Sequence, residues 1–242
     1  MSFVDLSHVI ERDMVTYPGL PGPEISSHLD FDESRAHYAP GTEFAIGRIS
    51  MVANTGTYLD APAHRFRDGG DLSWLPLQRC ALLPAVVVGG HGAIGSEAFD
   101  GVEVVGCAVL LRTGWDRHWG TERYADPDHP HLTGAGAERL VAGGAVLVGI
   151  DSVNIDDTAT GDRPAHTALL ASGVPVVEHL TGLQALPARG GTVHRGARGR
   201  AGARHLPGAR FRDRWLMTPL PRTGCGIDSD GGIRTGERAT RR

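Results

Sequence analysis

Short runs of Val, Ile and Leu, each bounded by Gly, Pro or a charged residue, place the strongest constraint on how this chain can fold. Runs of this length are typical of strands that are buried on both faces of a sheet. They occupy residues 44–52, 82–88, 104–111, 145–150 and 174–180. We therefore predict a sheet whose central strands are covered by other layers.

Two segments beside these runs have helical character. Residues 133–142 begin with a Thr that can cap a helix and end at Gly143 and Gly144, and residues 166–171 form a shorter candidate before the last run. Strands mixed with few helices favour an α/β or a layered β/β/α domain over an all-β sandwich. With 242 residues, the chain is long enough for one domain with a sizeable core.

The composition changes after residue 194. Residues 195–242 contain 12 of the 24 Arg of the chain but only four acidic residues, and they show no apolar periodicity. A basic tail for nucleic acid or anionic lipid is one explanation, and a disordered tail is another. A third explanation, a shift of the reading frame, accounts for more of the tail's composition. A gene rich in G and C tends to give Arg, Gly and Ala when it is read out of frame. A one-base shift across Arg204 to Arg212 permits the strand-like peptide Gly-Thr-Phe-Pro-Val-Arg-Ala-Phe-Ala.

We therefore divide the chain into a domain at residues 1–194 and an Arg- and Gly-rich tail at residues 195–242, which we hypothesise to be frameshifted and not native-like. A mistranslated tail would leave the domain without the strand that closes its sheet. Residues 1–194 alone contain 24 acidic residues against 12 Arg, a formal charge of −12. This charge argues against nucleic acid as a partner.

The number of cysteines and the hydropathy of the chain indicate the cellular compartment in which the protein is expected. Cys80, Cys107 and Cys225 are too few and too scattered for a disulfide framework, which fits a reducing cytoplasm. No run approaches the roughly 18 apolar residues of a membrane span, and residues 1–12 carry charges around a short apolar stretch. We expect a cytoplasmic protein with neither a secretion signal nor a membrane anchor.

The segment from Asn54 to His64 is the first candidate for chemistry. It places Asp60 and His64 four residues apart in a stretch rich in Thr, Gly and Pro. Gly relaxes the backbone and Pro removes a hydrogen-bond donor, so this segment is poor material for a helix or a central strand. We predict an irregular loop that presents polar side chains.

Two further candidates, His166 and Glu178, lie 12 residues apart, at a predicted helix start and on the strand that follows it. With Asp60 they supply one imidazole and two carboxylates, a set that suits Zn²⁺ or Mn²⁺ and can leave a position open for water. His64 could stand beside that water as an acid/base group. Each residue also has a simpler explanation. Asp60 could cap loop amides, His64 could bond to backbone, His166 could sit at a helix end and Glu178 could face solvent.

The segment from Asn54 to His64 resembles the signature His-x-Gly-Thr-His-x-Asp-x-Pro-x-His of the cyclase-type metal-dependent hydrolases, the family of bacterial kynurenine formamidase. Residues 166–178 are similar to the second signature of that family, a His and a Glu 12 residues apart. Further matches cover most of residues 1–190 in the order of the family: Asp5-Leu6-Ser7-His8, Tyr17-Pro18-Gly19, Val148-Gly149-Ile150-Asp151 and Ile155-Asp156.

The resemblance implies an α/β fold, a swivelling β/β/α layered single domain with a mixed central sheet. It also implies one or two ions, usually zinc or manganese, and hydrolysis of formamides or related cyclic amides. By position, Asp60 would be a carboxylate shared between metals, His166 and Glu178 would be ligands of one metal, and His64 would be the acid/base group. A homodimer or tetramer is implied by the resemblance alone.

This chain departs from the signature at Asn54 and Tyr58, where the family has histidines. Neither residue is a routine zinc ligand, so we expect at most one ion, zinc or manganese, bound with full affinity. Tyr58 could approach the metal as a phenolate, donate a hydrogen bond to a substrate carbonyl, or fill the vacated subsite. Asn54 could bind substrate or brace the loop. His179 follows Glu178 on the predicted strand and should point to the opposite face.

We therefore predict a metal-dependent hydrolase of an amide C–N bond in a small-molecule substrate, with an aryl formamide such as N-formylkynurenine first. A small cyclic amide or a lactone is the close alternative. From another class, a non-catalytic protein that binds a metal or a small ligand is the runner-up, because Asn54 and Tyr58 could have disarmed the site.

Overall fold

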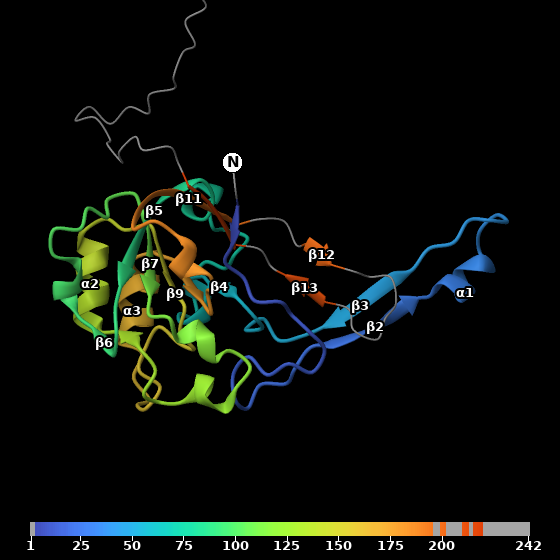
Figure 1. Ribbon diagram of the computed structural model, residues 1–242, viewed down its shortest axis with the longest axis horizontal. Helices are drawn as coiled ribbons and strands as arrows, with labels where there is room; N and C mark the ends of the chain where they lie inside the picture. Colours follow the sequence, from blue (N-terminus) through green and yellow to red (C-terminus); the bar gives the residue numbers. More distant parts are fainter. Residues whose placement is uncertain (1–2, 196–198, 202–209, 213–214, 220–242) are drawn as a thin grey trace, which may run out of the picture.

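The computed structural model describes residues 3–195, 199–201, 210–212 and 215–219, and its centre is an eight-stranded sheet (Figure 1). Along the sheet the strands follow the order β1, β14, β11, β5, β7, β9, β10, β4. Their bounds are β1 Val4–Asp5, β4 Tyr58–Asp60, β5 Leu83–Gly89, β7 Ala108–Arg112, β9 Leu147–Ile150, β10 Val176–Glu178, β11 Arg189–Arg195 and β14 Trp215–Pro219.

The sheet is mixed. Its central strands run parallel to one another, in the order β5, β7, β9 and β10. The strands on either side are antiparallel to them, because β11 pairs with β5 and β4 pairs with β10 in that orientation. Four of the five predicted runs overlap these parallel strands. The predicted fold class, an α/β domain with a mixed central sheet, is therefore confirmed.

Helices α2 (Gly134–Ala142) and α3 (Pro164–Ala171) cover one face of the sheet, and the predicted Thr133 caps α2 by accepting from the Gly136 amide. Successive residues of each parallel strand point to opposite faces. Val109 and Leu111 pack with the helices, and Ala108 and Leu110 pack on the other face against residues such as Leu183. Both faces are buried, which explains why the strands read as continuous apolar runs.

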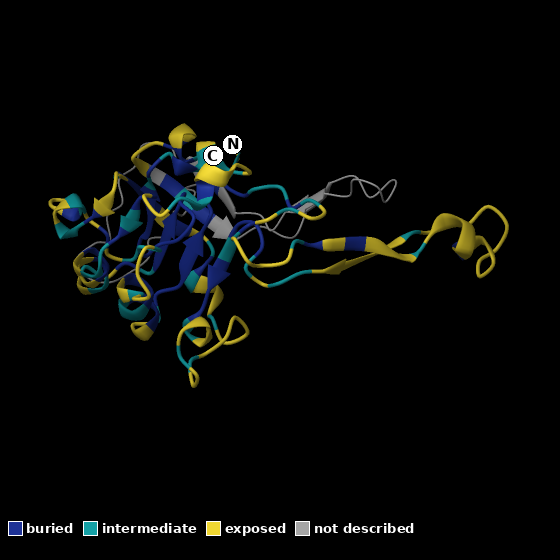
Figure 2. Ribbon diagram, turned by 90° about the horizontal axis from the view of Figure 1, so that it is seen from below, coloured by how far each residue is buried: buried dark blue, intermediate teal, exposed yellow. Residues whose placement is uncertain are grey.

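The prediction of a buried strand at residues 44–52 is wrong, because this segment does not join the central sheet. Strand β3 (Ile46–Ser50) pairs with β2 (Glu24–Leu29) in a two-stranded ribbon that carries the short helix α1 (Phe31–Arg35) towards its tip. Every residue of β3 is exposed, and the ribbon extends away from the body as an arm (Figures 1 and 2). Apolar composition alone could not distinguish an arm from a core strand.

The prediction of an irregular loop from Asn54 to His64 is also wrong in part, since the middle of this segment forms the edge strand β4. Gly56, at φ +67°, turns the chain into the strand, and Pro62 begins the 3₁₀ helix η1 (Pro62–His64) directly after it. Gly and Pro thus flank the strand without interrupting it. Tyr58 lies opposite Glu178, and Asp60 lies opposite Val176.

The remaining strands are β6 (Ala93–Ile94) with β8 (His131–Leu132), and β12 (Gly199–Ala201) with β13 (Arg210–Arg212). Contrary to the expectation that the tail leaves the sheet unclosed, β14 lies between β1 and β11. The boundary at residue 194 and the frame hypothesis stay predictions, and most of residues 195–242 lie outside the described residues. Within the described part, no helix has the length and apolarity needed to cross a bilayer.

The Thr57 hydroxyl ties the start of β4 to the end of β10, and this contact generates a stability prediction. It donates to the His179 carbonyl at 2.6 Å and accepts from the His8 amide at 3.0 Å, with Thr57 itself buried. Thr57→Val keeps the shape but leaves two polar groups unsatisfied, so we expect a loss of about 1–3 kcal/mol in the free energy of unfolding. Chemical denaturation measures it.

The matched control is Thr42→Val, because Thr42 is exposed on the arm. We expect the control to stay within about 0.5 kcal/mol of the parent chain. Equal stability of the two variants would show that Thr57 does not hold β4 in place.

Candidate metal centre

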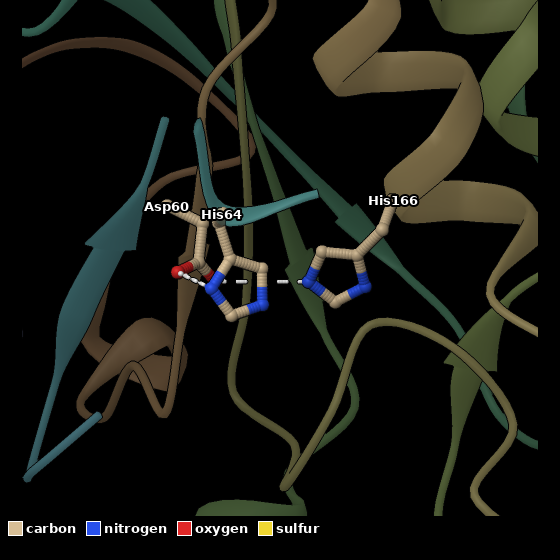
Figure 3. A group of neighbouring side chains, drawn as sticks. All are labelled: Asp60, His64 and His166. Atoms are coloured by element: carbon tan, nitrogen blue, oxygen red, sulfur yellow. Dashed lines mark ion pairs between the residues drawn. The ribbon is translucent and has the colours of Figure 1, made fainter. Parts of the chain in front are cut away.

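Strand β4 and helix α3 bring Asp60, His64 and His166 together beside β10 (Figure 3). Asp60 ends β4, His64 ends the 3₁₀ helix that follows it, and His166 lies in the first turn of α3. Glu178 ends β10 and faces the same side of the sheet as Tyr58, its partner in the strand pair. Residues more than 100 positions apart therefore meet at one edge of the sheet.

Within the predicted trio Asp60, His166 and Glu178, the two separations measured from His166 suit ligands of one ion. His166 Nε2 lies 3.6 Å from Asp60 Oδ2 and 3.6 Å from Glu178 Oε1. Ligands about 2.1 Å from a tetrahedral ion lie about 3.4 Å from one another. All three side chains are buried, so this is an interior site and not a solvated acidic surface.

Two of these atoms lack a partner. Asp60 Oδ2 and His166 Nε2 are buried and form no hydrogen bond within the described chain. A buried carboxylate oxygen and a ring nitrogen that face each other without a bond are costly unless a cation lies between them. The residues present therefore fit a divalent metal ion, as predicted.

Asp156 fixes the orientation of the His166 ring. Its Oδ2 atom lies 2.7 Å from His166 Nδ1, and its carboxylate also accepts from the backbone amides of Ala165 and His166. A carboxylate only accepts, so Nδ1 carries hydrogen and Nε2 is the nitrogen that can bind a metal. No role was predicted for Asp156, because it lies well before the N-cap residue Arg163 and reaches the first amides of α3 only through the folded loop.

His64 lies next to the trio but is partly open to solvent. Its Nδ1 atom lies 3.2 Å from Asp60 Oδ1, and 42% of its side chain is exposed, whereas that of Asp60 is 6% exposed. Its ring centroid is 5.6 Å from that of His166. The position suits the predicted acid/base role and also allows His64 to complete a ligand set with Asp60 and His166.

Tyr58 contacts Glu178 directly. Its hydroxyl donates to Glu178 Oε2 at 2.6 Å, and the nearby Asn54 side chain acts to lower the pKa of the same hydroxyl. Burial, followed by the negative charges of Glu178 and Asp60, raises the pKa of Tyr58 well above 10. Of the three alternatives for Tyr58, the phenolate is therefore disfavoured, and the hydroxyl is bound to a carboxylate of the protein.

His179 does not point to the face opposite Glu178, which corrects the prediction. Its Nε2 atom lies 3.3 Å from the Tyr58 hydroxyl, the same hydroxyl that binds Glu178. Strand β10 ends at Glu178, and His179 takes the left-handed backbone conformation at φ +56°, so the alternation of a strand no longer applies. A non-glycine residue in this conformation costs on the order of 1–3 kcal/mol and marks a site held by its surroundings.

The centre makes stability of the metal-free chain depend on pH. Burial disfavours the charged form of His166, but the carboxylates of Asp156, Asp60 and Glu178 outweigh it and raise its pKa to about 10. Burial raises the pKa of Glu178 to about 7. The folded chain thus binds protons more tightly than the unfolded chain, so stability present at pH 6.5 is lost as the pH rises towards 10.

Thermal melting in excess chelator from pH 6 to 10 measures this effect, and we expect the melting temperature to fall through that range. A divalent ion replaces the proton on His166 and should reverse the trend. His166→Gln is the control that should flatten the profile. A metal-free chain that grows more stable above pH 7 would contradict the proposed electrostatics.

Known proteins resemble this chain in sequence. The family model described as "Putative cyclase" matches residues 4–157. The kynurenine formamidase of Bacillus mycoides (strain KBAB4) is 26% identical over 180 residues, which cover 74% of this chain and 81% of that protein. The kynurenine formamidase of Maricaulis maris (strain MCS10) is 26% identical over 188 residues, covering 73% and 81%.

Solved structures share the fold. Isatin hydrolase A from Labrenzia aggregata has a TM-score of 0.70 at 22% identity, covering 89% of this chain and 93% of that chain. A potential metal-dependent hydrolase with cyclase activity has a TM-score of 0.66 at 21% identity, covering 89% and 96%. Because the family model matches more than half of the sequence, this chain belongs to the Cyclase family.

Proposed function

We propose that this chain is a metal-dependent hydrolase of an amide C–N bond, with an aryl formamide such as N-formylkynurenine as its substrate. The observation that carries the proposal is the buried pair Asp60 Oδ2 and His166 Nε2, which lacks a partner, with Glu178 at 3.6 Å and the accessible His64 beside it. The kynurenine formamidase relatives support the reaction class and the choice of substrate.

Asp60, His166 and Glu178 would hold one ion, zinc or manganese. One imidazole and two carboxylates form a donor set that both metals accept. A bound ion would polarise the substrate carbonyl and lower the pKa of water towards neutrality. Asp156 keeps the His166 ring in the orientation that this role needs, and Ile155 holds Glu178 Oε1 by donating its amide at 2.7 Å.

His64 would transfer the protons of the reaction. Its Nδ1 atom faces Asp60 Oδ1, so a hydrogen on Nδ1 leaves the lone pair on Nε2. That nitrogen would take a proton from the attacking water and then deliver it to the leaving nitrogen of the amide. Its partial exposure allows substrate to reach it, which buried His166 does not permit.

His64→Ala tests the assignment. We expect the turnover number to fall about 10²- to 10⁴-fold while the metal content stays unchanged. Turnover on N-formylkynurenine and metal analysis of the purified variant measure the two quantities, and His91→Ala, at an exposed loop position, is the control.

Full turnover in His64→Ala would refute the acid/base role. Loss of the metal in the same variant would instead identify His64 as a ligand with Asp60 and His166. A parent chain that binds metal but hydrolyses no formamide, lactone or cyclic imide would favour the binding-protein alternative.

We also propose that the protein is cytoplasmic, acts on a small molecule and has no nucleic-acid partner, and that it forms a homodimer or tetramer through the arm. The two-stranded ribbon has open edges and exposes Phe44, Ile46 and Ile49 by 52%, 44% and 49%. An isolated two-stranded ribbon is only marginally stable in water. Packing against a second copy would cover these side chains.

The double substitution Phe44→Ser with Ile49→Glu should therefore lower the oligomeric state, because it places polar and charged groups in the contact. Sedimentation velocity measures this, and Glu24→Gln at the exposed start of the ribbon is the control. An unchanged assembly in the double variant, or a monomeric parent chain, would overturn the role of the arm.

A further inference from the structure

Four side chains form a continuous line of hydrogen bonds behind the metal centre. The Tyr124 hydroxyl lies 2.8 Å from His179 Nδ1, His179 Nε2 lies 3.3 Å from the Tyr58 hydroxyl, and that hydroxyl lies 2.6 Å from Glu178 Oε2. We call Tyr124, His179 and Tyr58 the phenol relay. None of the three residues belongs to the ion-holding set proposed above.

When Glu178 is ionised, as it would be beside a bound cation, the contacts set the direction of every hydrogen bond in the phenol relay. An ionised carboxylate only accepts, so Tyr58 donates to Glu178 Oε2. The Tyr58 oxygen can then accept from His179 Nε2–H, which leaves Nδ1 without hydrogen and ready to accept from the Tyr124 hydroxyl. The relay is therefore a set of one-way bonds that all point towards Glu178.

The backbone at His179 is arranged to make this line possible. Its carbonyl accepts from Thr57 at 2.6 Å, and its left-handed conformation turns the ring towards Tyr58. The rings of Trp119 and Tyr124 pack against it, each with its centroid 5.7 Å away. Rings on two sides and a fixed carbonyl leave the imidazole little freedom.

The phenol relay determines which oxygen of Glu178 remains available to bind an ion. Oε2 is committed to Tyr58, whereas Oε1, which accepts from Ile155, is the oxygen 3.6 Å from His166 Nε2. Among the described residues, Asp60, His64 and His166 form the one group whose ligating atoms all lie within 4.8 Å of one another, and Glu178 Oε1 adjoins this group through His166 Nε2. The space beside Glu178 Oε2 is taken by the phenol.

We propose that Tyr58 is a positioning residue which, held by His179 and Tyr124, restricts Glu178 to one-oxygen coordination and limits the centre to a single ion. This inference rests on the metal centre of the proposed function. It goes further because it gives the two departures from the family signature, Asn54 and Tyr58, a shared structural role. The Asn54 side chain lies near the Tyr58 hydroxyl and acts on its pKa, and that hydroxyl holds Glu178.

Zinc titration of the metal-free full chain and the absorption spectrum of its cobalt form test the proposal. For Tyr58→Phe, which keeps the ring and removes the hydroxyl, we expect zinc affinity to fall about 10- to 100-fold. We also expect the cobalt bands to weaken, because Glu178 becomes free to bind through both oxygens and raise the coordination number. Tyr124→Phe should give a smaller change in the same direction, and Tyr38→Phe on the exposed arm should give none.

Ion stoichiometry provides the second measurement. The double substitution Asn54→His with Tyr58→His replaces the amide and the phenol by imidazoles, and we expect it to raise the number of bound zinc ions from one to two. Circular dichroism confirms that each variant is folded before titration.

The outcomes separate this inference from the proposed function. A parent chain that binds no divalent ion would overturn both. A parent chain that binds one ion, together with unchanged affinity and cobalt spectrum in Tyr58→Phe, would overturn the relay and leave the hydrolase proposal standing. A second ion in the unsubstituted chain would also overturn the relay.

Discussion

The antiparallel pairing of β4 with β10 is the constraint on which the rest of the site depends. Its register sets Tyr58 opposite Glu178 and Asp60 opposite Val176, so the three polar side chains share one face of the sheet edge. Leu59 and Val177 point to the other face and pack in the core. Since the side-chain period of a strand is two, a slip of β4 by one residue would turn Asp60 and Tyr58 into the apolar core and Leu59 towards the polar site.

The pairing also determines which elements surround the centre. The parallel strands β9 and β10 anchor one side of it, and α3, which is packed on the sheet, supplies His166 from the other. Asp156 joins these parts by binding both the first amides of α3 and the His166 ring. A ligand ring fixed by a second carboxylate loses little freedom when it binds an ion.

The central strands, α2 and α3 could be predicted from the sequence, because they depend on apolar runs and on cap residues. The spacing of a family signature singled out Asp60, His166 and Glu178, which the fold brings close together, and their role as metal ligands stays a prediction. Sequence reasoning missed β4, since a three-residue edge strand between Gly56 and Pro62 has no periodicity of its own. It misplaced His179 because a single left-handed residue reverses the direction that a strand pattern predicts. The exposure of β3 depends on what surrounds the arm, which composition does not encode.

Charge balance gives a physical reason for a phenol and an amide at the positions of two imidazoles. Asp60 and Glu178 bring two negative charges into a buried space, and one divalent ion offsets both. A second ion would need further ligands, and Asp156, the third carboxylate at the centre, has its oxygens engaged by His166 and two backbone amides. A neutral phenol satisfies Glu178 Oε2 without adding charge. The substitutions at Asn54 and Tyr58 are therefore consistent with a centre adjusted to one ion, in which hydrogen bonds replace the second.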